Sequence, residues 1–204
     1  MITPVLTALF SAVYFIVTIW LCRGVKLNAK ALSLGGVTCA LTLVLASIMI
    51  PLPSGSAITC GSWIPLMVLA IVWDPRLAFL AGWVCGVLAM ILIPAWQPVH
   101  WAQIFVEQMV CFSCLGYAGI FGSDRRWKVL LGMLLAIVLK FWGHVLSGVI
   151  FYSQNAWDGW GAWGYSLTYH LSSKVPEGAA TMLLISLLPL DTLRRVLHRT
   201  GNGG

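Results

Sequence analysis

The chain has 204 residues, of which 60% are apolar and only 9% are charged. A soluble domain carries about 25% charged residues because it must present a wetted surface around its core, so this composition excludes an ordinary soluble protein. The formal net charge is +6, but the basic residues lie in short segments between apolar runs. That distribution is typical of membrane topology and argues against nucleic-acid binding.

Seven apolar runs approach the length that crosses a lipid bilayer, roughly 17–25 residues. They are 4–22, 31–51, 58–73, 77–95, 101–121, 129–152 and 168–190. None shows strand-like alternation, and only helices and closed barrels satisfy their backbone groups in lipid, so the sequence predicts an all-α, polytopic membrane helix bundle. The first run lacks the basic segment and cleavage site of a signal peptide, which favours a membrane helix.

The distribution of basic residues predicts the orientation. The run 58–73 covers about 24 Å as a helix, less than the roughly 30 Å of a hydrocarbon core. If all seven runs cross, however, ten of the twelve Lys and Arg residues fall on one side: Arg23, Lys26, Lys30, Arg76, Arg125, Arg126, Lys128, Arg194, Arg195 and Arg199. The positive-inside rule then places the N-terminus outside and the C-terminus in the cytoplasm of a cell-membrane protein.

Four charged residues within the helices are left unexplained by topology: Lys140, Lys174, Glu107 and Glu177. Charges at membrane depth are costly and are usually paired or functional. Lys140 and His144 share a helix face at i,i+4 spacing, and Gly148 and Tyr152 continue that stripe. Lys174 and Glu177 can pair on their own helix at i,i+3. All of these groups fall in or near the predicted outer half.

These polar groups have two interpretations. Buried pairs can lock helices together without any ligand. Alternatively, they line a pocket open to the outside, where a carboxylate, an imidazole and aromatic rings suit a flat cationic heterocycle. The loop 153–167 carries Trp157, Trp160, Trp163 and Tyr165 among glycines, which predicts either an interfacial aromatic belt or a stacking lid over a flat ring.

Metal and cofactor sites are not indicated. The six cysteines lie mostly in apolar runs and are expected to pack as small hydrophobes. Cys111 and Cys114 have metal-site spacing, yet no second Cys/His pair lies near them in the sequence. No glycine-rich phosphate loop is present either. The sequence therefore predicts neither a metal nor another cofactor.

A family resemblance adds to this interpretation. Residues 140–166, KFWGHVLSGVIFYSQNAWDGWGAWGYS, resemble the fifth helix and following loop of the thiamine-specific S components of energy-coupling factor (ECF) transporters, the ThiT family. Weaker matches are GSWIP at 61–65, LAG at 80–82 and an acid at Glu107. The resemblance covers about residues 31–190. It implies a six-helix substrate-binding membrane domain at 31–200, with an additional N-terminal transmembrane helix and basic loop at 1–30.

The resemblance also implies a site. A thiamine pocket facing the outside would be lined by Glu107, Lys140, His144, Gly148 and Tyr165, and Gly148 would let the ligand approach its helix. The sequence departs from the family pattern at Gln108, Tyr152 and His170, where members carry Tyr, Trp and Asn, and at 56–59, where an aromatic residue is expected. A thiamine precursor or analogue is therefore an alternative ligand. Trp157 belongs to the predicted lid.

The family implies partners rather than catalysis. S components do not hydrolyse ATP; they work with a transmembrane coupling subunit and two ATPase subunits in the lipid bilayer. Docking requires small residues on a helix surface, and either Ala31 with Gly35 or Gly36 with Ala40 has the small-xxx-small spacing. Two other function classes remain: an intramembrane enzyme using His144 as base with Glu107, and a structural or assembly subunit.

Overall fold

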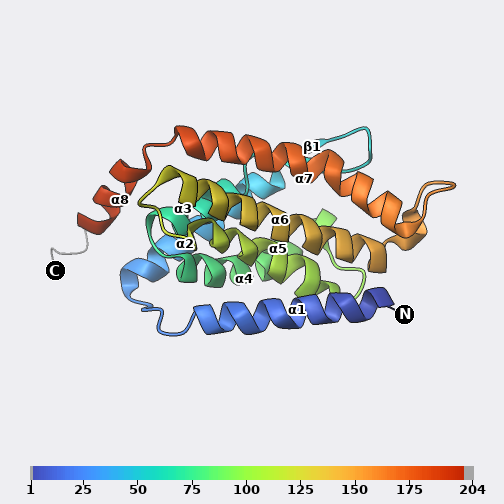
Figure 1. Ribbon diagram of the computed structural model, residues 1–204, viewed down its shortest axis with the longest axis horizontal. Helices are drawn as coiled ribbons and strands as arrows, with labels where there is room; N and C mark the ends of the chain where they lie inside the picture. The colour runs from blue at the N-terminus through green and yellow to red at the C-terminus, as the bar shows by residue number, and fades with distance from the viewer. Residues whose placement is uncertain (1, 200–204) are drawn as a thin grey trace.

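The computed structural model describes residues 2–199. Met1, the first residue of the predicted segment 1–30, and Thr200, the last residue of the predicted domain 31–200, lie outside the described residues. Long helices run along the length of the molecule (Figure 1), and shorter segments pack between them. The long helices are α1 Ile2–Leu21, α2 Ala29–Ser47, α4 Pro75–Leu92, α6 Arg126–Phe151 and α7 Ala162–Leu187. The shorter α-helices are α3 Ile64–Val72, α5 Val110–Ser113 and α8 Leu190–Arg199. The remaining segments are the 3-10 turns η1 Pro94–Trp96, η3 Cys114–Gly119 and η4 Ser153–Asn155, the π-helical η2 Ile104–Met109, and the strands β1 Met49–Pro51 and β2 Ala57–Thr59.

The helices α1, α2, α4 and α6 are each long and apolar enough to cross a membrane. The helical stretch Ile104–Gly119 is apolar but shorter. α7 has 26 residues, about 39 Å at the usual helical rise, and it carries the buried pair Lys174 and Glu177. The prediction of an all-α membrane helix bundle is confirmed, with one small antiparallel hairpin as the exception.

The predicted helix at 58–73 is wrong in its first half. Residues 57–59 form strand β2, which pairs with β1 so that Met49 faces Thr59 and Pro51 faces Ala57. Gly61 then adopts a left-handed conformation with φ +78°, which ends any regular element there, and Pro65 favours a new helix start. The chain nevertheless returns through α3 to the end of the bundle where α2 begins. The Lys30 ammonium at the start of α2 lies 5.0 Å from the ring centre of Trp73 at the end of α3.

Three other predicted runs differ in detail. The run 31–51 ends as a helix at Ser47, and its last three residues form strand β1. The run 101–121 is not one uniform helix, since it passes from the wide π-helix η2 through α5 to the tight η3. The run 168–190 begins six residues early, at Ala162, so Trp163 and Tyr165 lie on α7 and not in a loop. The final helix α8 was not predicted, although the spacing of Leu190, Leu193 and Leu197 is helical and these side chains pack against the core.

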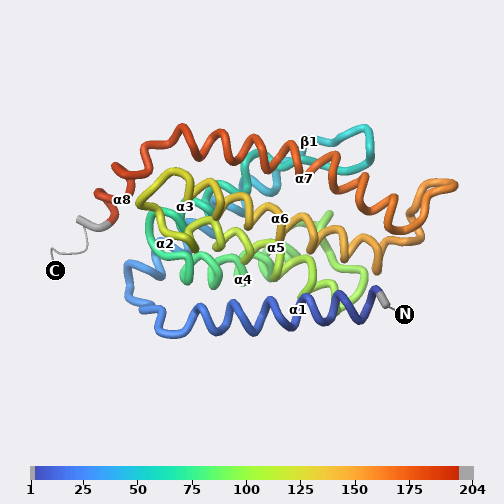
Figure 2. The backbone as a smooth tube through the Cα atoms, in the orientation of Figure 1, coloured from blue at the N-terminus to red at the C-terminus, as the bar shows by residue number. Residues whose placement is uncertain are grey.

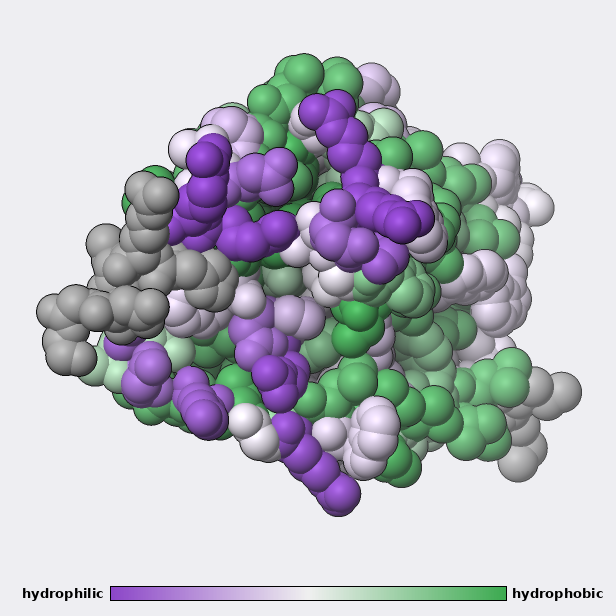
Figure 3. Space-filling view, turned by 60° about the vertical axis from the view of Figure 1, so that its left-hand side comes forward, coloured by the Kyte–Doolittle hydropathy of each residue, from purple (hydrophilic) through white to green (hydrophobic). Residues whose placement is uncertain are grey.

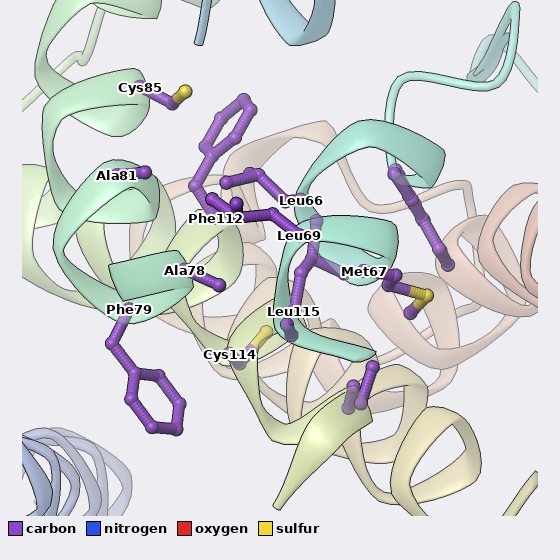
Figure 4. Close-up of a cluster of buried hydrophobic side chains, with 14 of the residues drawn as sticks. Leu66, Met67, Leu69, Ala78, Phe79, Ala81, Cys85, Phe112, Cys114 and Leu115 are labelled. Carbon is purple, nitrogen blue, oxygen red and sulfur yellow. The ribbon is translucent and has the colours of Figure 1, made fainter. Parts of the chain in front are cut away.

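The apolar core lies between α3, α4 and the α5–η3 segment (Figure 4). Leu66 and Met67 of α3, Phe79 and Cys85 of α4, and Leu115 of η3 are all fully buried. Such interiors pack as densely as organic crystals, so this cluster fixes α3, α4 and η3 relative to one another. The core therefore provides a rigid base beside which the polar residues of η2, α6 and α7 lie.

The two ends of the bundle differ in polarity. The hairpin and the 152–161 linker lie towards the end that holds the N-terminus, and α8 lies at the opposite end (Figure 2). Hydrophilic side chains gather around the α8 end (Figure 3). The exposed basic residues of the segments that meet there are Arg23, Lys26, Arg76, Arg125, Arg126 and Arg195. The basic segments of the sequence thus converge on one end of the molecule.

α1 packs against α5, α6 and η2. The Tyr14 hydroxyl lies 2.6 Å from the Ser113 hydroxyl, and the Phe15 ring contacts Trp83 and Phe105. The opposite face of α1 is apolar and exposed, as at Ile16 and Trp20, which suits contact with lipid. The predicted additional N-terminal helix, α1, therefore lies on the outside of the bundle and packs along its side.

Candidate functional site

A cavity of about 410 Å³ lies between the hairpin, η1, η2, α6 and α7. This volume is within the range of small-molecule sites in proteins, about 300–1,000 Å³. Its walls include eight of the nine site residues predicted from the sequence: Glu107, Gln108, Lys140, His144, Gly148, Tyr152, Tyr165 and His170. The ninth, Trp157, is not among the lining residues and contacts the site only through Tyr165.

Glu107 is the best-supported polar group in the cavity wall. It lies in the π-helix η2, a wide turn of a kind that is rare and often found at functional sites. One carboxylate oxygen accepts from Gln103 Nε2 and Ser147 Oγ, each at 2.6 Å, and the other lies 3.2 Å from His144 Nδ1. Three donors from two helices thus hold one carboxylate, which stabilises its charged form.

The contact with Glu107 fixes the tautomer of His144. An ionised carboxylate only accepts hydrogen bonds, so Nδ1 must carry the proton and the neutral ring presents Nε2 as an acceptor. His144 Nε2 and His170 Nδ1 are both buried and have no hydrogen-bond partner among the described residues. The two imidazole rings stack, with centroids 5.4 Å apart and planes 22° apart. Buried polar atoms without partners are rare and often mark a ligand position.

Lys140 lies in an aromatic cage. Its ammonium group donates to the Cys111 carbonyl at 2.8 Å and lies 5.1 Å and 4.9 Å from the ring centres of Trp63 and Phe112. Only 4% of the residue is exposed. Cation–π contacts of this kind strengthen when the cation is desolvated. An ammonium has three donors, so Lys140 has capacity for an acceptor in the cavity beyond Cys111.

The predicted pair of Lys174 and Glu177 is present, with Nζ and Oε2 3.5 Å apart. The other oxygen of Glu177 accepts from the backbone N–H of Thr59 at 3.1 Å and from the Thr59 hydroxyl. α7 continues through Pro176 without a break. The pair therefore has the structural role that the first interpretation assigned to it, since it attaches the hairpin to α7, while Lys174 also lines the cavity.

On the side of the cavity formed by α6, α7 and their linker, the lining aromatic residues are tyrosines and not the tryptophans of the predicted lid. Tyr152, Tyr165 and Tyr169 line it. Trp157 meets Tyr165 edge to face at 5.1 Å and Trp160 at 5.2 Å. Trp160 and Trp163 are 48% and 40% exposed. These two rings match an interfacial belt, whereas Trp157 supports a cavity wall from behind.

Gly148 and Gln108 both lie in the cavity wall. A Cβ at Gly148 would lie 2.3 Å from Ser166 Oγ and 3.1 Å from His170 Nε2. The small residue therefore makes room for α7, and the expectation that it also lets the ligand approach α6 stays a prediction. Gln108 donates through its amide to the Trp96 carbonyl at 3.1 Å, which attaches η2 to η1.

Sequence reasoning missed several cavity residues. Ser56, Thr59, Ser62 and Trp63 come from the hairpin and the start of α3. Ser56 lies between two predicted runs, and the other three lie where a continuous helix was predicted. Gln103 was overlooked although it stands four residues before Glu107, on the same helical face. Ser147 follows His144 by three residues, so the same spacing rule could have found it.

The arrangement suits recognition of a cationic aromatic ligand. It combines one carboxylate, an acceptor nitrogen, a caged ammonium and tyrosine rings in a partly apolar enclosure. The described residues 2–199 hold no group of three or more His, Cys, Asp or Glu side chains placed to bind a metal ion. The 3.2 Å contact of His144 with Glu107 also meets the requirement of the acid–base alternative.

Comparisons with known proteins give a family and a similar fold. Residues 32–197 match the model of a family described as thiamine transporter protein. The chain is 25% identical over 157 residues to the thiamine transporter ThiT of Bacillus subtilis strain 168, a match that covers 71% of this chain and 81% of the relative. The solved structure of ThiT from Listeria monocytogenes is similar in fold, with a TM-score of 0.70 at 24% identity over 82% of this chain and 96% of that one. α1 lies outside the family match.

Proposed function

Because the chain belongs to the thiamine transporter protein family, we propose that it is the substrate-binding subunit, or S component, of an ECF-type vitamin uptake transporter and that its cavity binds thiamine. The observation that carries this proposal is the Glu107 carboxylate, held by Gln103, Ser147 and His144 at the wall of a 410 Å³ cavity. Thiamine consists of two flat rings joined by a methylene group, one of them permanently cationic, and such a carboxylate balances its charge.

Charge and hydrogen bonding define the orientation of the ligand. The thiazolium ring carries the positive charge, so it belongs near Glu107 and away from the ammonium groups of Lys140 and Lys174. The aminopyrimidine ring offers nitrogen acceptors for Lys140. Tyr152 lies three helical turns from Lys140, about 18 Å along α6, so the hydroxyethyl tail points to the Tyr152 end.

The membrane orientation follows from the charged end of the bundle. We infer that the α8 end, with Arg23, Arg125 and Arg195 exposed, faces the cytoplasm. The N-terminus, the hairpin and the cavity then face the outside of the cell membrane. Uptake requires this arrangement, because the ligand has to enter the site from outside.

The transmembrane coupling subunit, together with its two ATPase subunits, is proposed to dock on α2. Of the two candidate pairs of small residues, Ala31 and Gly35 are buried inside the bundle, and the Gly35 position faces Leu77 of α4. Gly36 and Ala40 are exposed, and a Cβ at Gly36 would meet nothing within 4 Å. The Gly36–Ala40 face is therefore the one open to close approach by another helix.

A thiamine precursor or analogue is the second candidate ligand. It is favoured by the cavity residues Gln108, Tyr152 and His170, whose hydrogen bonds and ring contacts give this site its own pattern of donors and acceptors. Thiamine has to be compared with its separate pyrimidine half and with its phosphates to decide between these ligands.

The decisive test is ligand binding by the purified protein in detergent, followed through the fluorescence of its eleven Trp residues. We expect tight, saturable quenching by thiamine, and recovery of unchanged ligand after prolonged incubation. Chemical turnover would instead support the acid–base alternative. The absence of binding to thiamine, its pyrimidine half and its phosphates would contradict the proposed function.

A further inference from the structure

Gln103 has a hydrogen-bonding arrangement that fixes the orientation of its amide group. The residue is 1% exposed and lies one turn before Glu107. Its Oε1 lies 2.9 Å from the backbone nitrogen of Val99, which can only donate. The amide oxygen must therefore face Val99, and the NH₂ group must face the other side.

The two N–H groups of that amide then have definite acceptors. Nε2 lies 2.6 Å from Glu107 Oε2, which takes one hydrogen, and 2.9 Å from Tyr152 Oη, which takes the other. Both donors of Gln103 are thus used, and the Tyr152 hydroxyl accepts. A phenol oxygen that accepts one hydrogen bond still has a proton, and this proton cannot point back at the donating amide.

The position of Tyr152 determines where this proton is directed. Tyr152 ends α6, its backbone N–H bonds the Gly148 carbonyl at 3.1 Å, and the residue lines the cavity. The Gln103 amide occupies one side of the hydroxyl. The O–H is therefore left to donate towards the cavity, at the end far from Lys140.

We propose that Tyr152 is a specificity-determining residue that donates a hydrogen bond to an oxygen acceptor at the outer end of the ligand, and that Gln103 is the positioning residue that directs this donor. The inference rests on the proposed function, in which the hydroxyethyl oxygen of thiamine is that acceptor. A site built to bond a polar group discriminates against an analogue that lacks it, because its own donor then stays unpaired.

Gln103 also links this selection to charge recognition. The same amide bonds the Glu107 carboxylate and the Tyr152 hydroxyl, so one residue places the group that meets the cation and the group that meets the tail. Substituting Gln103 removes one support from each of these two groups, whereas substituting Tyr152 with Phe removes the tail contact and leaves the Gln103–Glu107 bond in place.

The test compares thiamine with an analogue whose hydroxyethyl group is replaced by ethyl. The measured quantity is the ratio of the two dissociation constants, which does not depend on how much of a variant is folded. We expect the wild-type protein to favour thiamine about tenfold, the effect of one hydrogen bond. Tyr152→Phe keeps the ring, so it should weaken thiamine alone and bring the ratio close to one.

Gln103→Leu should lower the ratio too, since the hydroxyl is then free to turn, and it should weaken both ligands through Glu107. Gln154→Leu is the matched control: Gln154 is exposed, bonds the Phe151 carbonyl and is not among the residues that line the cavity, so the ratio should stay at the wild-type value. A wild-type ratio near one, or a Tyr152→Phe ratio equal to that of the wild type, would overturn the inference while leaving the proposed function intact. Failure of the wild type to bind either compound would instead remove the proposed function.

Discussion

Thr59 in strand β2 and Glu177 in the middle of α7 are bonded to each other across 118 residues of sequence. The Glu177 carboxylate accepts from both the backbone N–H and the hydroxyl of Thr59, and its other oxygen meets Lys174. Only 2% of the Glu177 side chain is exposed. A buried carboxylate is costly unless it is fully paired, so this contact determines where the hairpin can lie.

Glu177→Gln should therefore destabilise the protein by about 1–3 kcal/mol, because the new amide places donor hydrogens against Lys174. Thr59→Val removes only one hydroxyl bond and should cost about 0.5–1.5 kcal/mol. The measurement is thermal unfolding in detergent without ligand. In the double variant the two effects should fall short of their sum, since both residues act in one network. Strict additivity would show that the contact makes no net contribution.

Glu107→Gln tests the charge balance directly. The amide keeps the size of the side chain but removes the negative charge that the thiazolium would meet. Thiamine affinity should fall by roughly 2–5 kcal/mol, the range for losing one partner of a buried charge pair. Binding of a neutral analogue, in which the charged ring is replaced by an uncharged one, should fall much less. Equal losses for both ligands would show that Glu107 supports the fold and does not recognise the cation.

The fold was predictable to the extent that it depends on apolar length and charge. The run that became α6 was placed within three residues at its start and one at its end, because Arg125 and Arg126 border a long apolar segment. The hairpin was not predictable in this way. Residues 57–59 are as apolar as a helix, and only the pairing with β1, a tertiary contact, makes them a strand.

The site was predictable where spacing along one helix brings groups together. Lys140, His144, Gly148 and Tyr152 follow each other at i,i+4, and all four line the cavity. The side chains that reach the cavity from other elements were not predictable from such spacing. Ser56 and Trp63 enter through the hairpin and the start of α3, and no spacing rule relates those positions to α6. Gly148 also has a packing role against Ser166 of α7 that spacing along α6 does not indicate.

Gly148→Ala should destabilise the protein by about 1–3 kcal/mol, the usual cost of overpacking, because the new methyl group would lie 2.3 Å from Ser166 Oγ. It should also shift His170, whose Nε2 lies 3.1 Å from the same point, and so weaken ligand binding. Adding Ser166→Gly removes the obstructing hydroxymethyl group and should restore part of both losses. If the second substitution restores neither, the close approach of α6 and α7 at Gly148 is not the cause.

The Gly36–Ala40 face of α2 provides the last prediction, because it separates ligand binding from transport. Gly36→Leu adds a bulky side chain where the structure leaves open space, so the fold and thiamine binding should be unchanged. Thiamine uptake by cells that also express the coupling subunit and ATPases should fall at least severalfold, since close approach of another helix requires small residues. Gly36→Ala is the matched control: a methyl group preserves the small surface, and replacing a mid-helix glycine should add up to about 1 kcal/mol of stability. Normal uptake by the Gly36→Leu variant at an equal amount of protein would mean that the coupling subunit docks on another face of the bundle.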